Sequence, residues 1–179
     1  MQRIFIGIPV DERGQGPVNR LLRPVKRVSQ DIRWIPEHNR HLTLAFLGNK
    51  SKPQIDCLLH AFDETFGKAS KFQFCLSALT RFPDSRGRII ALTGQSGGPL
   101  EAVHLATKNL LDKNGIEFDQ KQFRPHVTLG YIRKARQVKA VFDQQTQILL
   151  NVDRVVLYRS KPTVTGSIFT RLKETKLGQ

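Results

Sequence analysis

Two short stretches of this sequence match each other position by position: HLTLAF at residues 41–46 and HVTLGY at residues 126–131. Each stretch runs histidine, aliphatic residue, threonine, leucine, small residue and aromatic residue. The two histidines lie 85 residues apart, which is close to half of the 179-residue chain. A repeat at this spacing predicts two similar strands, one in each half of the fold.

Each stretch, called a motif below, has the period-two alternation of a strand. Alternate side chains of a strand point to opposite faces, so the first, third and fifth residues share a polar front and the other three share an apolar back. The fronts carry His41, Thr43 and Ala45 in the first motif and His126, Thr128 and Gly130 in the second, and the backs carry Leu42, Leu44 and Phe46 or Val127, Leu129 and Tyr131. We expect the backs to pack against helices and the fronts to face a cleft.

Two such fronts that face each other suit acid and base catalysis at phosphorus. In-line displacement has its attacking and leaving oxygens on opposite sides of the phosphorus, so one proton is removed on one side and another is donated on the other. Histidine serves both roles because its ordinary pKa of about 6.5 leaves both forms accessible near neutrality. We predict His41 and His126 as the catalytic pair, with Thr43 and Thr128 donating hydrogen bonds to phosphate oxygens.

The composition favours a polyanionic partner. The chain has 29 Lys+Arg against 15 Asp+Glu, so its formal net charge is +14 at pH 7, a balance that attracts nucleic acid. A run of about 18 apolar residues, which a membrane span needs, is missing, and the short apolar start lacks the features of a signal peptide. We therefore expect a cytoplasmic protein of one domain, in which Cys57 and Cys75 are buried, reduced thiols.

The rest of the chain alternates between strand-like and helix-like periodicity. Strands are predicted at residues 3–10, 42–47, 72–79, 88–93, 126–132, 148–158 and 167–172, with a short extended piece at 34–36. Helices are predicted at 18–27, from Ser51 to Gly67, from Gly98 to Gly115 and at 135–142. Strands outnumber helices and strict βαβ alternation is missing, so the pattern predicts an α+β fold with mostly antiparallel sheet.

A metal site is the main chemical alternative at the first motif. His38 and His41 have an H-x-x-H spacing with Glu37 beside them. A metalloprotease helix needs H-E-x-x-H, and the strand pattern that follows His41 argues against a helix here. We therefore predict no metal site, and we expect His60 and His104 to be structural or surface residues.

The motifs and their surroundings resemble the signature of the 2H phosphoesterase superfamily, which is named for its two histidines. Within it the chain is most similar to the bacterial RNA 2′,3′-cyclic phosphodiesterases, also called LigT-like or ThpR-type and formerly 2′-5′ RNA ligases. The resemblance extends over the opening strand at 3–8, the motif strands at 41–48 and 123–129, and the closing hairpin at 157–160 with Gly166 and Leu172. It implies a bilobal fold over residues 1–179: a single domain of two mostly antiparallel sheets with outer helices and a pseudo-two-fold axis around a central cleft.

The resemblance also implies a division of roles between the histidines. His41 would be the proton donor to the departing 3′-oxygen, and His126 would be the proton acceptor from the attacking water. Thr43 and Thr128 would hold the phosphate. The product would be an RNA end with a 2′-phosphate, made without metal, ATP or another cofactor.

One position departs from the family pattern. Many relatives have arginine five residues after the second histidine, where this chain has Tyr131. Arg133 and Arg124 are the candidates for replacing that contact.

The implied partner is RNA with 2′,3′-cyclic phosphate ends, including tRNA halves, and we expect a monomer without membrane attachment. The family is also credited with the reverse reaction, the ATP-independent 2′-5′ joining of RNA ends. Two alternatives stay open. One is a phosphodiesterase of 2′-5′-linked oligonucleotides or small cyclic nucleotides, and the other is an RNA-binding module whose histidines are not catalytic.

Overall fold

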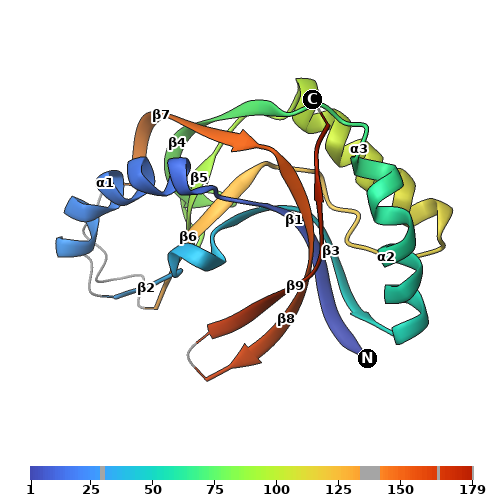
Figure 1. Cartoon of the computed structure of the whole chain (residues 1–179). Helices are drawn as coiled ribbons and strands as arrows, with labels where there is room; N and C mark the ends of the chain where they lie inside the picture. The colour runs from blue at the N-terminus through green and yellow to red at the C-terminus, as the bar shows by residue number, and fades with distance from the viewer. Residues whose placement is uncertain (29–30, 134–141, 165, 179) are drawn as a thin grey trace.

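The computed structural model describes residues 1–28, 31–133, 142–164 and 166–178. Its strands are β1 (Gln2–Pro9), β2 (Ile32–Trp34), β3 (His41–Lys50), β4 (Phe72–Phe82), β5 (Ile89–Thr93), β6 (His126–Ile132), β7 (Asp143–Val152), β8 (Arg154–Thr163) and β9 (Gly166–Lys176). Its helices are α1 (Glu12–Val28), α2 (Lys52–Phe66) and α3 (Gly98–Lys113), with a 3-10 turn η1 at Glu37–Asn39. The predicted α+β fold class is therefore confirmed (Figure 1).

The described strands form one antiparallel sheet in the order β7-β4-β5-β6-β3-β1-β8-β9, and β2 pairs with β6. We call β3, β1, β8 and β9 the first half-sheet, and β6, β5, β4 and β7 the second half-sheet. The two sheets that we expected are thus continuous, because the motif strands β3 and β6 are joined at the pairing Leu42↔Val127. Each half-sheet has its motif strand on the inside, next to the other half.

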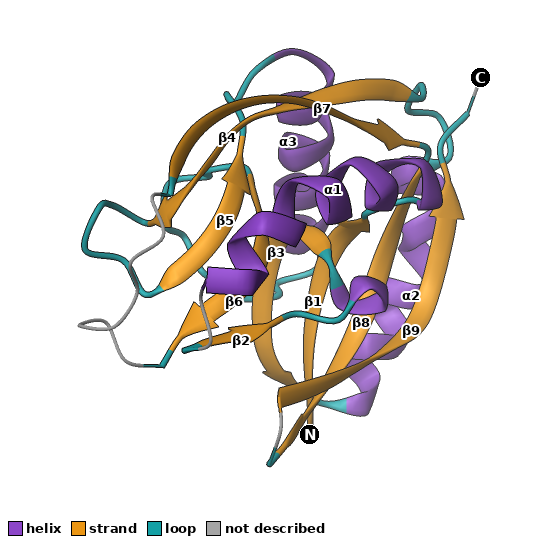
Figure 2. Ribbon diagram, turned by 90° about the vertical axis from the view of Figure 1, so that its left-hand side faces the viewer, coloured by secondary structure: helices purple, strands orange, loops and turns teal. Residues whose placement is uncertain are grey.

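Helices pack against both half-sheets. α2 and α3 lie side by side, with α2 against β9 and α3 against β3 of the first half-sheet, and α1 lies against β7 of the second half-sheet (Figures 1 and 2). α2 begins where the sequence predicts, because the backbone N–H of Ser51 donates to Oε1 of Gln54 (3.0 Å) and closes the first turn. α1 begins earlier than predicted, because Oδ1 of Asp11 accepts a hydrogen bond from the N–H of Gly14 (3.0 Å) and caps an extra turn.

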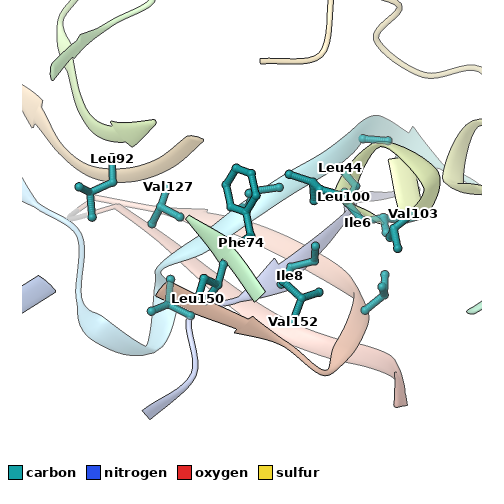
Figure 3. Packing of buried hydrophobic residues seen from close by; sticks show 14 of the residues in the cluster. Ile6, Ile8, Leu44, Phe74, Leu92, Leu100, Val103, Val127, Leu150 and Val152 are labelled. Atoms are coloured by element: carbon teal, nitrogen blue, oxygen red, sulfur yellow. The ribbon is translucent and has the colours of Figure 1, made fainter. Parts of the chain in front are cut away.

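One hydrophobic cluster connects both half-sheets with the three helices. It includes Ile6 and Leu44 of the first half-sheet, Leu92 and Val127 of the second, Val18 of α1, Phe62 of α2, and Leu100 and Val103 of α3 (Figure 3). Burial of these apolar side chains fixes the motif strands from behind. The polar fronts of the same strands are thereby held in place.

The predicted strand at 148–158 is two strands in the structure. The chain leaves the second half-sheet at Val152 and joins the first at Arg154, with only Asp153 between them. Apolar residues continue on both sides of this change of partner. Hydrophobic periodicity alone therefore does not reveal it.

The predicted burial of the cysteines was wrong, since Cys57 and Cys75 are both exposed, although both are free thiols as predicted. Cys75 alternates with the buried Phe74 and Leu76 along β4, so its side chain faces away from the core. The predicted helix at 135–142 lies outside the described residues, except for Phe142. No helix within the described ranges is long and apolar enough to cross a membrane.

Candidate active site

The motif strands bring the four predicted polar side chains into one cleft. A cleft of about 230 Å³ is lined by His41, Thr43, His126 and Thr128. β3 and β6 run antiparallel and are joined at the pair Leu42↔Val127. His41 therefore lies next to Thr128, and Thr43 lies next to His126. Imidazoles and hydroxyls from both strands therefore surround one small space.

Four of the six side chains predicted on the apolar backs of the motifs lie in the core. The buried motif positions, each at most 3% exposed, are Leu42, Leu44, Val127 and Leu129. On the front, Gly7 of β1 pairs with Thr43 and allows the chains to approach closely. A Cβ at Gly7 would come within 2.8 Å of the Leu42 carbonyl oxygen and within 3.4 Å of Cδ2 of His41.

Both histidines are held by the same backbone contact. Nδ1 of His41 lies 2.7 Å from the carbonyl oxygen of Asn39, and Nδ1 of His126 lies 2.7 Å from the carbonyl oxygen of Arg124. A carbonyl oxygen only accepts, so Nδ1 carries the proton in each ring and Nε2 is the acceptor of the neutral form. Nε2 is therefore the atom through which each ring exchanges a proton with a ligand.

Aromatic rings enclose His41. Its ring centroid lies 4.7 Å from that of Phe5, 5.2 Å from that of Phe169 in an edge-on arrangement, and 5.9 Å from that of Tyr158. Burial lowers the pKa of His41 from 6.5 to about 4, against the opposing effect of the Asn39 carbonyl, and the charge of His126 lowers it further. Both rings line the same cleft, so a positive charge on one disfavours a positive charge on the other.

The environment of His126 is more open. The ring stacks on Phe82 with a centroid distance of 4.0 Å and an interplanar angle of 22°. Burial lowers the pKa of His126, the bond to the Arg124 carbonyl raises it, and the positive charge of Arg124 lowers it. The Arg124 guanidinium carbon itself lies 4.8 Å from the centre of the Phe82 ring.

Strict alternation fails at the end of each motif, and this corrects one prediction. The pairing of β3 with β1 skips Leu44, and the pairing of β6 with β5 skips Leu129, so each strand has a β-bulge at the same motif position. The extra residue turns the two aromatic residues that follow, Phe46 and Tyr131, toward the front. Both line the cleft instead of packing in the core, and they are 48% and 37% exposed.

The arginine candidates do not line this cleft. Arg124 donates from Nη2 to the carbonyl oxygen of Pro83 in a neighbouring pocket, and Arg133 is exposed, with its backbone N–H bonded to the carbonyl of Asp31 (2.8 Å). Arg3 of β1 does line the cleft, although it belongs to no motif that would have selected it from the sequence.

The metal alternative at Glu37, His38 and His41 finds no support in the side-chain positions. Oε1 of Glu37 accepts a hydrogen bond from Nδ2 of Asn19 (2.8 Å). Within the described residues, no three His, Cys, Asp or Glu side chains gather as a metal-binding group.

Comparisons with known proteins find relatives and solved structures that match nearly the whole chain. RNA 2′,3′-cyclic phosphodiesterase of Thermotoga maritima is 27% identical over 176 residues, which cover 96% of this chain and 94% of that protein. The crystal structure of TT0787 of Thermus thermophilus matches with a TM-score of 0.82 and 22% identity, covering 98% of this chain and 97% of that one. E. coli LigT complexed with 3′-AMP matches with a TM-score of 0.78 and 21% identity over 99% of both chains.

These structural matches confirm the predicted LigT-like fold. In addition, the family model of the 2′-5′ RNA ligase superfamily matches residues 16–163, a range that includes both motifs and most of both half-sheets. The chain therefore belongs to the 2′-5′ RNA ligase superfamily, the 2H phosphoesterases that its paired His-x-Thr strands resemble.

Proposed function

We propose that this protein hydrolyses the 2′,3′-cyclic phosphate end of RNA to a 2′-phosphate, by acid and base catalysis without a metal ion. The observation that carries the proposal is the pair of imidazoles in one cleft, each with Nδ1 bonded to a backbone carbonyl and Nε2 left for a ligand. Supporting it, relatives along nearly the whole chain are named RNA 2′,3′-cyclic phosphodiesterases.

In the proposed reaction, Nε2 of His126 takes a proton from water as the water oxygen attacks phosphorus. The bond from phosphorus to the 3′-oxygen breaks, and Nε2 of His41 donates a proton to that oxygen. Thr43 and Thr128 donate hydrogen bonds to the non-bridging oxygens, on which negative charge builds up. The phosphate stays attached to the 2′-oxygen.

The low pKa of His41 fits the role of acid if the ring takes up a proton from solvent when the anionic substrate binds. With its pKa at about 4, only about 0.1% of the free protein carries a proton on His41 at pH 7. An anionic phosphate beside the ring favours the charged form. Once protonated, a group with an intrinsically low pKa is a strong donor to an alkoxide leaving group.

We further propose that the protein acts as a cytoplasmic monomer on RNA ends, tRNA halves among them, and that residues 1–179 form a single domain of two related lobes. The excess of 14 positive charges supports a polyanionic partner. The symmetric strand order around β3 and β6, with one hydrophobic cluster behind both, supports the two-lobe description.

The test is product analysis with matched variants. Protein in EDTA is incubated with an RNA that ends in a 2′,3′-cyclic phosphate, and we expect a 2′-phosphate. His41→Ala and His126→Ala should each lower kcat by about 10²–10⁴. His60→Ala is the matched control, because His60 is exposed on α2 and should change kcat by less than about twofold.

Three outcomes would contradict the proposal: a 3′-phosphate product, loss of activity on chelation, or full activity of either catalytic variant. RNA binding without turnover in every form, wild type included, would support the RNA-binding module instead.

A further inference from the structure

The two motif histidines differ in the residue that stands between each of them and its carbonyl partner. In the second motif this residue is Pro125, whose ring fixes φ at about −65° and so orients the carbonyl before it toward the second histidine. In the first motif the same position is occupied by Arg40, which has no such ring. Its φ of −73° nevertheless lies close to that of a proline. Contacts of another kind must therefore hold the Asn39 carbonyl against His41.

The Arg40 side chain is buried against α1, at 2% exposed. Its Nη1 donates to Oε1 of Gln15 and to Oδ1 of Asn19, at 2.8 Å in each case. These two α1 residues are four positions apart, so they lie on the same face of the helix. The guanidinium therefore connects two successive turns of α1 to the backbone directly before His41.

The same two amides also contact the 3-10 turn η1. Nε2 of Gln15 donates to the carbonyl oxygen of Glu37 (2.9 Å), and Nδ2 of Asn19 donates to Oε1 of Glu37 (2.8 Å). The backbone N–H of Arg40 closes the turn on the Glu37 carbonyl (3.0 Å). Each amide thus accepts from Arg40 through its oxygen and donates to Glu37 through its nitrogen, which fixes the orientation of both side chains. The result is a closed hydrogen-bond network around the turn that contains Asn39.

Neighbouring strands hold the turn as well. Nδ2 of Asn39 donates to the carbonyl oxygen of Ser167 in β9 (2.9 Å), and the carbonyl oxygen of Arg40 accepts from the N–H of Val10 (3.0 Å). The Asn39 carbonyl oxygen then meets Nδ1 of His41 at 2.7 Å. Removing the guanidinium would leave the oxygens of the two α1 amides without their donor, so these side chains would reorient and release the turn.

Packing alone does not account for an arginine at this position. A buried guanidinium costs free energy that an apolar side chain of similar size would avoid. Methionine in place of Arg40 would fill much of the same space, but it could not orient the two amides. What the arginine contributes is therefore the geometry of the turn, and through it the direction of the Asn39 carbonyl.

We propose that Arg40 is a positioning residue, which keeps the Asn39 carbonyl against Nδ1 of His41 and thereby keeps Nε2 directed at the departing oxygen. The inference rests on the proposed function, because it concerns the step in which His41 acts as the acid. The Asn39 carbonyl also stabilises the protonated ring, since it accepts a hydrogen bond from Nδ1 in that form too. Loss of the contact should therefore slow protonation of the departing oxygen without weakening the contacts of Thr43 and Thr128 with the phosphate.

The kinetic experiment compares variants on an RNA that ends in a 2′,3′-cyclic phosphate. Arg40→Met keeps most of the aliphatic length and removes the hydrogen bonds, so we expect kcat to fall by about tenfold to a hundredfold and KM to change by less than about threefold. Arg40→Lys keeps a charged donor, and its kcat should lie between those of wild type and Arg40→Met. Lys50→Met is the matched control. It removes another buried cation, at the far end of β3, and should change kcat by less than about twofold.

A ¹⁵N NMR measurement of the histidine rings tests the same contact without turnover. At a pH where both rings are neutral, we expect wild type to carry the proton on Nδ1 of His41 and of His126. In Arg40→Met the His41 ring should become a mixture of the two tautomers, while His126 should be unchanged. If Arg40→Met does not fold, Asn19→Ala is the second variant. It removes one acceptor of Arg40 at a position of α1 where alanine favours the helix, and it should change the His41 tautomer in the same direction.

The proposal is overturned if folded Arg40→Met retains the kcat of wild type, or if Arg40→Lys restores none of the lost activity. It is also overturned if His41 keeps its tautomer in the variants, or if His41 and His126 change tautomer together. Failure of wild type to hydrolyse the cyclic phosphate would instead refute the proposed function. The tautomer measurement needs no turnover, so the two failures are distinguishable.

Discussion

Replacing Phe169 by alanine should raise the pKa of His41, because burial is the largest cause of its depression from 6.5 to about 4. Phe169 is the ring of the β8–β9 hairpin that meets His41 edge-on at 5.2 Å and lines the cleft beside it. Phe5 and Tyr158, the other two rings around His41, are more deeply buried and less suitable for mutation, at 3% and 6% exposed.

The expected rise in the pKa of His41 is calculated by dividing the effect of burial equally among the three rings that surround it. Full reversal of the depression would increase the protonated fraction of His41 near neutrality by about 300-fold. If the three rings contribute equally to excluding water, loss of one increases that fraction by the cube root, about sevenfold.

The assay is an NMR titration of the histidine ring signals in wild type and Phe169→Ala. Ile168→Ala, a truncation at an exposed neighbour in the same hairpin, is the matched control and should leave the His41 midpoint in place. An ordinary midpoint for His41 in wild type would refute the reasoning, as would an unchanged midpoint in Phe169→Ala despite intact folding.

The same environments determine how activity and stability respond to pH and to mutation. The plot of kcat/KM against pH should be bell-shaped with its maximum below pH 6.5, because burial lowers the pKa values of both His41 and His126. Steady-state kinetics measure this profile, and a maximum above pH 7 would contradict the prediction. His41 alone should lower the free energy of unfolding by about 3 kcal/mol as the pH drops from 6.5 toward 4, because the unfolded chain binds that proton more readily. The lowered pKa of His126 adds a loss of the same sign, and urea titrations of wild type and His41→Ala across this range isolate the His41 contribution. Leu129→Ala should cost about 2–5 kcal/mol in urea unfolding, because the side chain is fully buried behind the second motif, and a cost below about 1 kcal/mol would mean that the strand is not packed as described.

The repeated motif was sufficient to predict the centre of the site. Histidine and threonine at alternate positions of two strands require a shared front, and His41, Thr43, His126 and Thr128 do line one cleft. Alternation could not predict the bulges at Leu44 and Leu129, since an extra residue in one strand depends on its pairing partner.

The rest of the cleft comes from strands that carry no motif. Arg3 and Phe169 belong to β1 and β9, and they reach the site only because these strands lie in the same half-sheet as β3. Strand order is a long-range property that local periodicity does not specify. For the same reason, the change of half-sheet at Asp153 was not visible in the apolar pattern of residues 148–158.

The two motifs supply the same residue types, so the different roles that we propose for the two histidines must come from what surrounds them. Identical backbone contacts give both rings the same tautomer, so tautomer cannot decide which ring is the acid. Enclosure by aromatic rings can decide it. Burial of His41 among Phe5, Tyr158 and Phe169 disfavours its charged form, and an anionic phosphate beside the ring favours that form again. The His126 ring, which stacks on Phe82, lines the cleft beside His41 and is the more open of the two. Exchanging the two environments, rather than the two histidines, is therefore the change that should reverse their roles.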